Sequence, residues 1–96
     1  MKKKFLCIDK YEARKLASLI FIKEGNETFI TEILDVIENE IIVGLKDKSA
    51  HSVLLKDQRQ AEEFTDFIQS VIEKQHKITG TKTQDDEVEI EKGSDK

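Results

Sequence analysis

The chain has 96 residues, of which 38% are hydrophobic and 38% are charged, and its formal net charge is −4. This length and composition suit one small domain with a modest core. The single cysteine cannot form an intramolecular disulfide, and no apolar run approaches the ~20 residues of a membrane span, so we expect a cytoplasmic protein that does not cross a membrane. Frequent lysine and isoleucine without proline or tryptophan are typical of an AT-rich bacterial or phage genome.

The charge is unevenly distributed along the chain. Residues 1–80 carry 13 Lys or Arg and 14 Asp or Glu, whereas residues 81–96 carry three lysines and six acidic residues. A near-neutral body argues against generic attraction to nucleic acid, which needs a concentrated basic surface. Because Val88 and Ile90 are the only large apolar residues after Ile78, we expect a single globular α+β domain at 1–79 and a disordered acidic tail at 80–96.

The N-terminal segment combines a strand with a short helix. "KKFLCI", residues 3–8, is rich in β-forming residues and predicts a strand. In "DKYEARKLA", residues 9–17, Asp9 and Glu12 have the spacing of a helix capping box, which predicts one or two helical turns. The end of this helix is left open, because the residues from 18 onward also fit a strand.

Four segments rich in β-branched residues follow, separated by short turns. Gly25 and Asn26 supply the positive φ angles of a tight hairpin turn, and Gly44 within a strand indicates a bulge or a close backbone approach. Successive strands joined by turns predict an antiparallel meander. The segments are "SLIFIK" (18–23), "TFITEILDVI" (28–37), "EIIVGLK" (40–46) and "HSVLLK" (51–56).

A longer amphipathic helix is predicted at residues 58–76. Asp57 is a suitable N-cap, Gln60 completes a capping-box pattern, and Gly80 marks the stop. The apolar residues recur at spacings of three and four and form one stripe. These residues are Ala61, Phe64, Phe67, Ile68, Val71 and Ile72.

Together these elements predict an α+β fold in which a meander of four or five strands packs against a C-terminal amphipathic helix. The sheet is either open or curled into a small barrel. The order of meander and helix resembles the back half of pleckstrin-homology-like domains, and the short strands resemble SH3- or Sm-like barrels, over about residues 17–76. That resemblance implies a fold and no function. We detect no internal repeat in the sequence.

The sequence contains no pattern that favours catalysis, a metal or a cofactor. Its four glycines are isolated, which excludes a phosphate-binding loop. Cys7, His51 and His76 are the only thiol and imidazole groups, and each stands alone locally. Cys7 with His51 is the one nucleophile–base combination in predicted strands, and a cysteine at the centre of a strand is usually inaccessible. We therefore expect no enzyme, no cofactor and no metal site.

The remaining function class is binding, and two surfaces are candidates for a protein partner. The helix stripe of Phe64, Phe67, Ile68, Val71 and Ile72 is wider than a small sheet needs, so its surplus could form a homodimer interface. In the tail, Val88 and Ile90 alternate with glutamates, which suits strand addition to the edge of a partner's sheet.

We therefore predict a small non-enzymatic protein-binding or regulatory module, encoded by a phage or mobile element. The alternative is a nucleic-acid-binding SH3- or Sm-like barrel, in which an aromatic ring lies among basic side chains. The residues of that alternative are Lys2, Lys3, Lys4, Lys10, Tyr11, Arg14 and Lys15.

Overall fold

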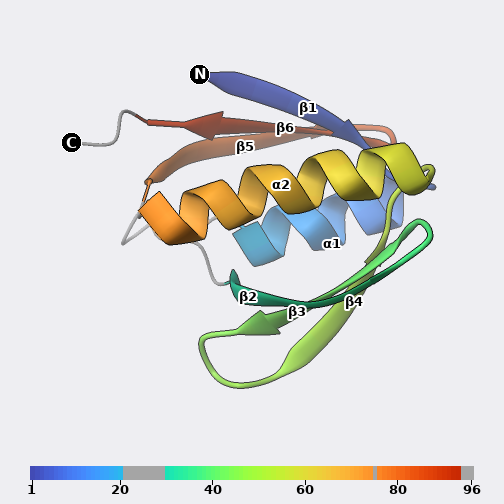
Figure 1. Ribbon diagram of the computed structural model, residues 1–96. Helices are drawn as coiled ribbons and strands as arrows, with labels where there is room; N and C mark the ends of the chain where they lie inside the picture. Colours follow the sequence, from blue (N-terminus) through green and yellow to red (C-terminus); the bar gives the residue numbers. More distant parts are fainter. Residues whose placement is uncertain (21–29, 75, 94–96) are drawn as a thin grey trace.

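The computed structural model describes residues 1–20, 30–74 and 76–93. Two three-stranded antiparallel sheets enclose two helices, so that the layers run sheet, helices, sheet (Figure 1). One sheet has the strand order β1-β6-β5 and the other β2-β3-β4. The elements are β1 (Lys2–Leu6), α1 (Lys10–Ile20), β2 (Ile30–Ile37), β3 (Glu40–Leu45), β4 (Ala50–Leu54), α2 (Gln58–Lys74), β5 (Ile78–Gln84) and β6 (Glu87–Lys92).

The predicted α+β class is confirmed, and the predicted arrangement is wrong in two respects. The described strands form two separate sheets and no closed barrel, and α2 is internal because β5 and β6 follow it. Over the described residues the meander contains three strands, and residues 18–20 of the predicted strand at 18–23 continue α1. Leu19 and Ile20 extend the apolar stripe of that helix and are buried, so packing decides the boundary that local preference left open. Residues 21–23 of the strand predicted at 18–23, and the predicted Gly25-Asn26 turn, lie outside the described residues.

The C-terminal segment is a hairpin over its described residues, which differs from the disordered tail predicted at 80–96. β6 is the central strand of its sheet and pairs with both β5 and β1. Val88 and Ile90 lie on its inner face and are fully buried. Considered alone, this acidic segment cannot bury enough apolar surface to become ordered. β1, nearly the whole chain length away, supplies the missing partner.

The core lies between the sheets and is centred on the two helices. Phe5 of β1 is fully buried, and its ring meets Phe64 edge-on at 5.2 Å and Phe67 at 5.5 Å between centroids. Both ring arrangements are favourable for aromatic pairs. Neither helix within the described ranges is long and apolar enough to cross a membrane. The molecule is compact, with a Cα radius of gyration of 12.0 Å.

The structure reveals an internal repeat, although none was detected in the sequence. The order strand–helix–strand–strand occurs twice, as β1-α1-β2-β3 and as β4-α2-β5-β6. Asp9 and Asp57 cap the two helices, each accepting a hydrogen bond of 2.9 Å from a backbone N–H three residues later. The two hairpin turns contain Glu38 and Asp85 at φ angles of 55° and 54°. Buried helix positions also correspond: Ala13, Leu16, Leu19 and Ile20 match Ala61, Phe64, Phe67 and Ile68.

The two repeats exchange strands. Each sheet contains the hairpin of one repeat and the first strand of the other. The predicted capping-box residues serve this exchange: Glu12 accepts from the N–H of Leu54 in β4, and Gln60 accepts from the N–H of Leu6 in β1, both at 2.8 Å. Between these contacts Cys7 forms an antiparallel bridge with Leu55. The two repeats therefore fold as one unit.

Candidate functional site

Each sheet has an inner face against the helices and an outer face. The pairing register defines the outer faces, because side chains alternate along a strand. In β3, Ile41 and Val43 are buried in the core, so Ile42 points outward. In β6, Val88 and Ile90 are buried, so Glu89 points outward. Ile42 and Glu89 occupy equivalent positions at the centre of the two outer faces.

The outer face of the β1-β6-β5 sheet is a solvated array of opposite charges. Lys2 and Lys4 of β1 lie directly opposite Glu91 and Glu89 of β6, and Lys82 of β5 also lies opposite Glu89. Such cross-strand pairs stabilise a sheet by about 0.2–1 kcal/mol each. The N-terminal lysine cluster and the acidic C-terminal segment therefore lie on neighbouring strands and face each other in this sheet.

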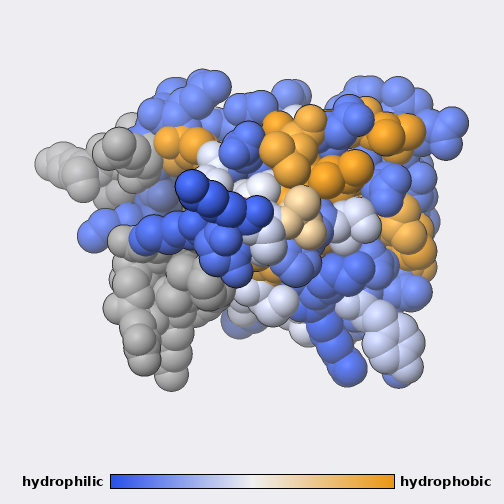
Figure 2. Space-filling view, turned by 90° about the horizontal axis from the view of Figure 1, so that it is seen from below, coloured by the Kyte–Doolittle hydropathy of each residue, from blue (hydrophilic) through white to orange (hydrophobic). Residues whose placement is uncertain are grey.

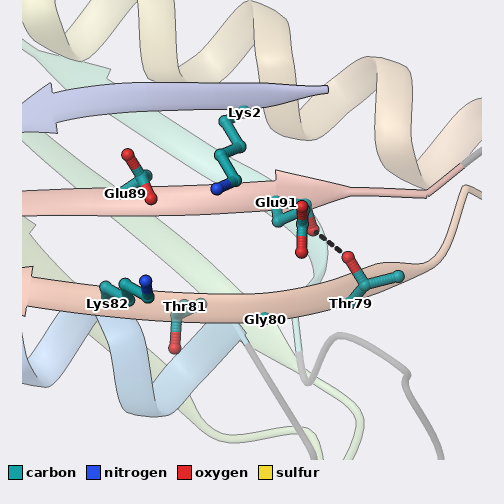
Figure 3. Close-up of a pocket in the computed structure, with 7 residues that line it drawn as sticks. All are labelled: Lys2, Thr79, Gly80, Thr81, Lys82, Glu89 and Glu91. Atoms are coloured by element: carbon teal, nitrogen blue, oxygen red, sulfur yellow. Dashed lines mark hydrogen bonds between the residues drawn. The ribbon is translucent and has the colours of Figure 1, made fainter.

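A shallow hollow of ≈ 270 Å³ lies on this charged face (Figure 3). It is bordered by Lys2, Glu91 and Lys82, and the Thr79 hydroxyl donates to the carbonyl of Glu91 at 3.3 Å. Positive and negative side chains alternate around it, which gives it no preference for an anion or a cation. We assign it no ligand.

The outer face of the β2-β3-β4 sheet carries aliphatic side chains together with the carboxylates of Glu32, Asp35 and Glu40. Ile42 is at its centre, and Leu54 and Ile37 lie diagonally from it on the flanking strands, both opposite Glu40. Figure 2 views the molecule from the side of this sheet and shows apolar side chains interspersed with hydrophilic ones. Three large apolar side chains on this face, Ile8, Leu34 and Ile37, are 46–50% exposed. At the far end the side chain of Glu32 lies over Gly44. We name Ile8, Leu34, Ile37, Ile42 and Leu54 the apolar sheet face.

Two irregularities bring further apolar side chains to this face. The pairing of β2 with β3 shifts between Ile33 and Asp35, so Leu34 lies in a β-bulge. Leu34 borders a shallow outer groove of ≈ 450 Å³ together with Gly44 and Ala50. The equivalent part of β5 pairs without a shift. Bulges commonly re-aim side chains beside functional sites.

On the β4 side of the sheet, the N–H of Ile8 donates to the carbonyl of Leu54 at 3.2 Å, which places Ile8 beside the sheet.

The repeat provides an internal control for this apolar character. Most of the equivalent outer positions hold different kinds of residue in the two sheets, whereas Leu54 corresponds to Leu6 and Glu40 corresponds to Glu87. The fold alone therefore does not require an apolar side chain at each of them. Ile42 corresponds to Glu89, and Ile8 corresponds to Lys56, whose N–H bonds to Leu6 as that of Ile8 bonds to Leu54. On the β1-β6-β5 sheet the charged residues at these positions are Lys2, Lys4, Lys56, Lys82, Glu87, Glu89 and Glu91. On the described part of the β2-β3-β4 sheet they are Glu32, Asp35 and Glu40.

The edges of the β2-β3-β4 sheet are occupied by side chains. On β4, the Leu54 N–H bonds to Glu12, and the Ser52 carbonyl accepts from the Lys15 ammonium at 3.1 Å. On β2, the Val36 N–H bonds to the carboxylate of Asp35 at 2.8 Å, and the strand carries two register shifts. Occupied backbone groups and bulges oppose the addition of another strand. The exposed apolar surface is thus accessible on its face and protected along its edges.

The partner-binding residues predicted from the sequence lie in the interior. Ile72 is partly buried against the core. All the others are buried: Phe64, Phe67, Ile68, Val71, Val88 and Ile90. The helix stripe is covered because α2 lies between two sheets, where the sequence analysis assumed one. The apolar sheet face was missed, although "EIIVGLK" gave a signal: consecutive Ile41, Ile42 and Val43 place an apolar side chain on the outer face of a strand.

The basic residues of the nucleic-acid alternative do not form one surface. Lys2 and Lys4 belong to the charged face described above, and the Lys3 ammonium lies 5.9 Å from the centre of the Phe5 ring. On α1, Lys15 is paired with Glu12 at 3.1 Å. Exposed Tyr11 lies beneath the Lys10 ammonium, 5.5 Å from the ring centre, and Arg14 is also exposed.

The cysteine and the histidine considered for catalysis are not brought together as a reactive pair. Cys7 is fully buried in its bridge with Leu55. Burial, and secondarily the carboxylate of Glu12, raises the pKa of its thiol to about 12, so it carries almost no thiolate at neutral pH. His51 is exposed near the start of β4.

Asp47 and Ser49 of the β3-β4 turn lie close to His51 at the start of β4. The Ser49 hydroxyl donates to the Asp47 carboxylate and lies 3.1 Å from His51 Nε2. The hydrogen bond from Ser49 lowers the pKa of the Asp47 carboxyl. A serine that donates to the carboxylate cannot also donate its proton to the imidazole, so this order does not activate the hydroxyl. Within the described part of the chain, no His, Cys, Asp and Glu side chains form a group suited to a metal ion.

Comparison of the chain with protein-family models, with curated proteins and with solved structures gives no match.

Proposed function

We propose that this chain is a small non-enzymatic protein-binding module and that the apolar sheet face is its binding surface. The observation that carries the proposal is the contrast between the two outer faces at equivalent positions. Large exposed apolar patches on soluble domains commonly mark binding sites. The charged counterpart demonstrates that this fold accommodates a solvated face at these positions.

The chemistry of the site supports binding over catalysis. The branched aliphatic side chains of Ile37 and Leu54 lie diagonally from Ile42, beside Asp35 and Glu40, and this arrangement offers aliphatic contact area without an activated nucleophile. Partly exposed side chains such as Leu34 and Ile37 gain about 25 cal/mol for each Å² that a partner covers. A few such residues at the centre of a contact commonly supply most of its binding energy.

A matched pair of variants tests this proposal. Ile42→Glu gives β3 the residue that β6 has at the same position, and Glu89→Ile makes the reverse change on the charged face. Each tagged variant and the unaltered chain would be used to capture partners from a cell lysate, with and without nuclease. We expect a protein that is retained by the unaltered chain and by Glu89→Ile and is lost with Ile42→Glu.

Two results would contradict the proposal. One is equal capture by both variants, which would move the site away from the apolar sheet face. The other is loss of all captured material on nuclease treatment, which would favour the nucleic-acid alternative and the exposed side chains of Lys10, Tyr11 and Arg14. Circular dichroism of each variant would establish that it is folded.

A further inference from the structure

The charged residues at the outer strand positions of the apolar sheet face are Glu32, Asp35 and Glu40, and all three are acidic. Lys46 and Lys48 border the groove beside Leu34, at the end of the face near the β3-β4 turn. Asp35 lies directly opposite Ile42, and Glu40 lies between Leu54 and Ile37. An apolar partner surface that carried carboxylates would meet repulsion here, whereas basic side chains would be attracted.

The acidic character continues around the edge of β2. Ile37 belongs to the outer face, and the adjacent residue Val36 points to the other side. Val36 forms part of a groove of ≈ 260 Å³ between β2 and α2. Glu38, Glu62 and Asp66 line this groove, and the described residues that border it include no lysine or arginine. A long basic side chain from a partner on the sheet could reach around β2 toward these carboxylates, with its aliphatic stem on Ile37.

A second copy of this chain is a poor occupant of the face. Three strands at about 4.8 Å spacing and about 20 Å length cover about 300 Å². A stable interface buries about 800 Å² on each partner. A symmetric pair would also bring the acidic side chains of both copies together. An added strand is disfavoured as well, because side chains occupy the edges at Leu54 and Val36.

The dimensions of the face fit one helix. A helix is about 10 Å in diameter, and three turns extend about 16 Å, which matches a sheet of three strands. We propose that the occupant is a basic amphipathic helix of a partner protein, with its aliphatic stripe on the apolar sheet face and its lysines or arginines along the β2 side. This inference rests on the proposed function and specifies the chemistry of the partner.

Two synthetic peptides test it. One is a helical peptide of about 14 residues with leucines at i, i+3, i+4 and i+7 and lysines elsewhere, and the other has glutamates in place of the lysines. Each is titrated into ¹⁵N-labelled protein while the amide resonances are followed. We expect the lysine peptide to shift the amides of β2, β3 and β4, to bind at least about tenfold more tightly than the glutamate peptide, and to lose about tenfold in affinity with Ile42→Glu.

The charge contribution is tested separately with Asp35→Asn combined with Glu40→Gln, which keeps the shape of the face. We expect this double variant to weaken the lysine peptide about two- to fivefold, by an amount that decreases as salt is raised. Glu89→Gln on the charged face serves as the matched control, and we expect unchanged affinity.

Four results would overturn the inference. They are no binding up to about 1 mM peptide, equal binding of both peptides, resonance changes confined to β1, β5 and β6, and a dimer in sedimentation that dissociates with Ile42→Glu. If the peptides fail while capture of a cellular protein still depends on Ile42, the proposed function stands and only the helix chemistry is wrong. If Ile42→Glu also leaves the capture of cellular proteins unchanged, both the proposed function and the helix inference are wrong.

Discussion

Replacing Ile90 with alanine tests whether the C-terminal segment is part of the core. Ile90 is fully buried, and it pairs with Lys3 in β1 and Thr81 in β5. An isoleucine truncated to alanine in such a site typically costs about 2–5 kcal/mol, from lost transfer energy and from the cavity that remains. Small domains are stable by only about 5–15 kcal/mol, so this single change should remove a large fraction of the free energy of unfolding.

The assay is urea denaturation at 25 °C followed by circular dichroism, together with thermal unfolding. A loss of about 3 kcal/mol lowers the Tm by about 12–24 °C for a domain of this size. The adjacent variant Glu89→Ala is the control, since it removes only exposed cross-strand charge pairs worth about 0.2–1 kcal/mol each. If Ile90→Ala cost no more than Glu89→Ala, residues 80–92 would not be packed as described, and the segment would be the disordered tail that its composition suggests.

Three further predictions follow from the same structure. The pKa of the Cys7 thiol is raised from 9.0 to about 12, so its thiolate fraction at pH 8 is roughly a thousandfold lower than that of a free thiol. We therefore expect a thiol reagent to label Cys7 only as fast as the protein unfolds. Stoichiometric labelling of the native protein within minutes would be inconsistent with the buried β-bridge between Cys7 and Leu55. Glu38→Gly and Asp85→Gly each relieve a positive φ angle, so urea denaturation should detect a gain of about 0.5–1 kcal/mol for each, and a loss at either turn would refute the assigned conformation. Chain fragments divided at the β3-β4 turn should be unstructured singly and recover the native circular dichroism when mixed, because the repeats exchange strands; a folded monomeric fragment would contradict the exchange.

Sequence patterns predicted most individual elements correctly. The predicted helix at 58–76 is α2, and the caps at Asp9 and Asp57 are formed. These features depend on spacings of three and four residues, which a sequence displays directly. The strands at "KKFLCI", "EIIVGLK" and "HSVLLK" were found for the same reason, through their β-branched residues.

Partner choice among strands could not be predicted. β1 pairs with β6 across almost the whole chain, and no local pattern records such a contact. The repeat was also hidden, because corresponding positions retain burial more often than identity. Leu16 matches Phe64, for example, and Phe5 matches Val53. Core positions tolerate changes of apolar residue when the volume is accommodated, so the structure preserved a symmetry that the sequence obscured.

The residues predicted to bind a partner are mostly buried for a related reason. Phe64 and Phe67 were predicted to belong to a helix stripe wider than one small sheet needs, and Val88 was predicted to lie in an acidic tail outside the fold. The sheet of β1, β6 and β5 was not predicted, and it covers Phe64 and Phe67 and holds Val88 on its inner face. Ile42 was placed in a predicted strand with no face assigned to it, and only the pairing register reveals that it points outward while Ile41 and Val43 point inward.

The most direct test of the apolar sheet face is site-specific photo-crosslinking in the cell. A photoreactive phenylalanine analogue would replace Ile42 in one version of the chain and Glu89 in another, at equivalent central positions of the two outer faces. We expect a covalent product with another protein from position 42 and none from position 89. No product at position 42, or the same product from both positions, would contradict the account.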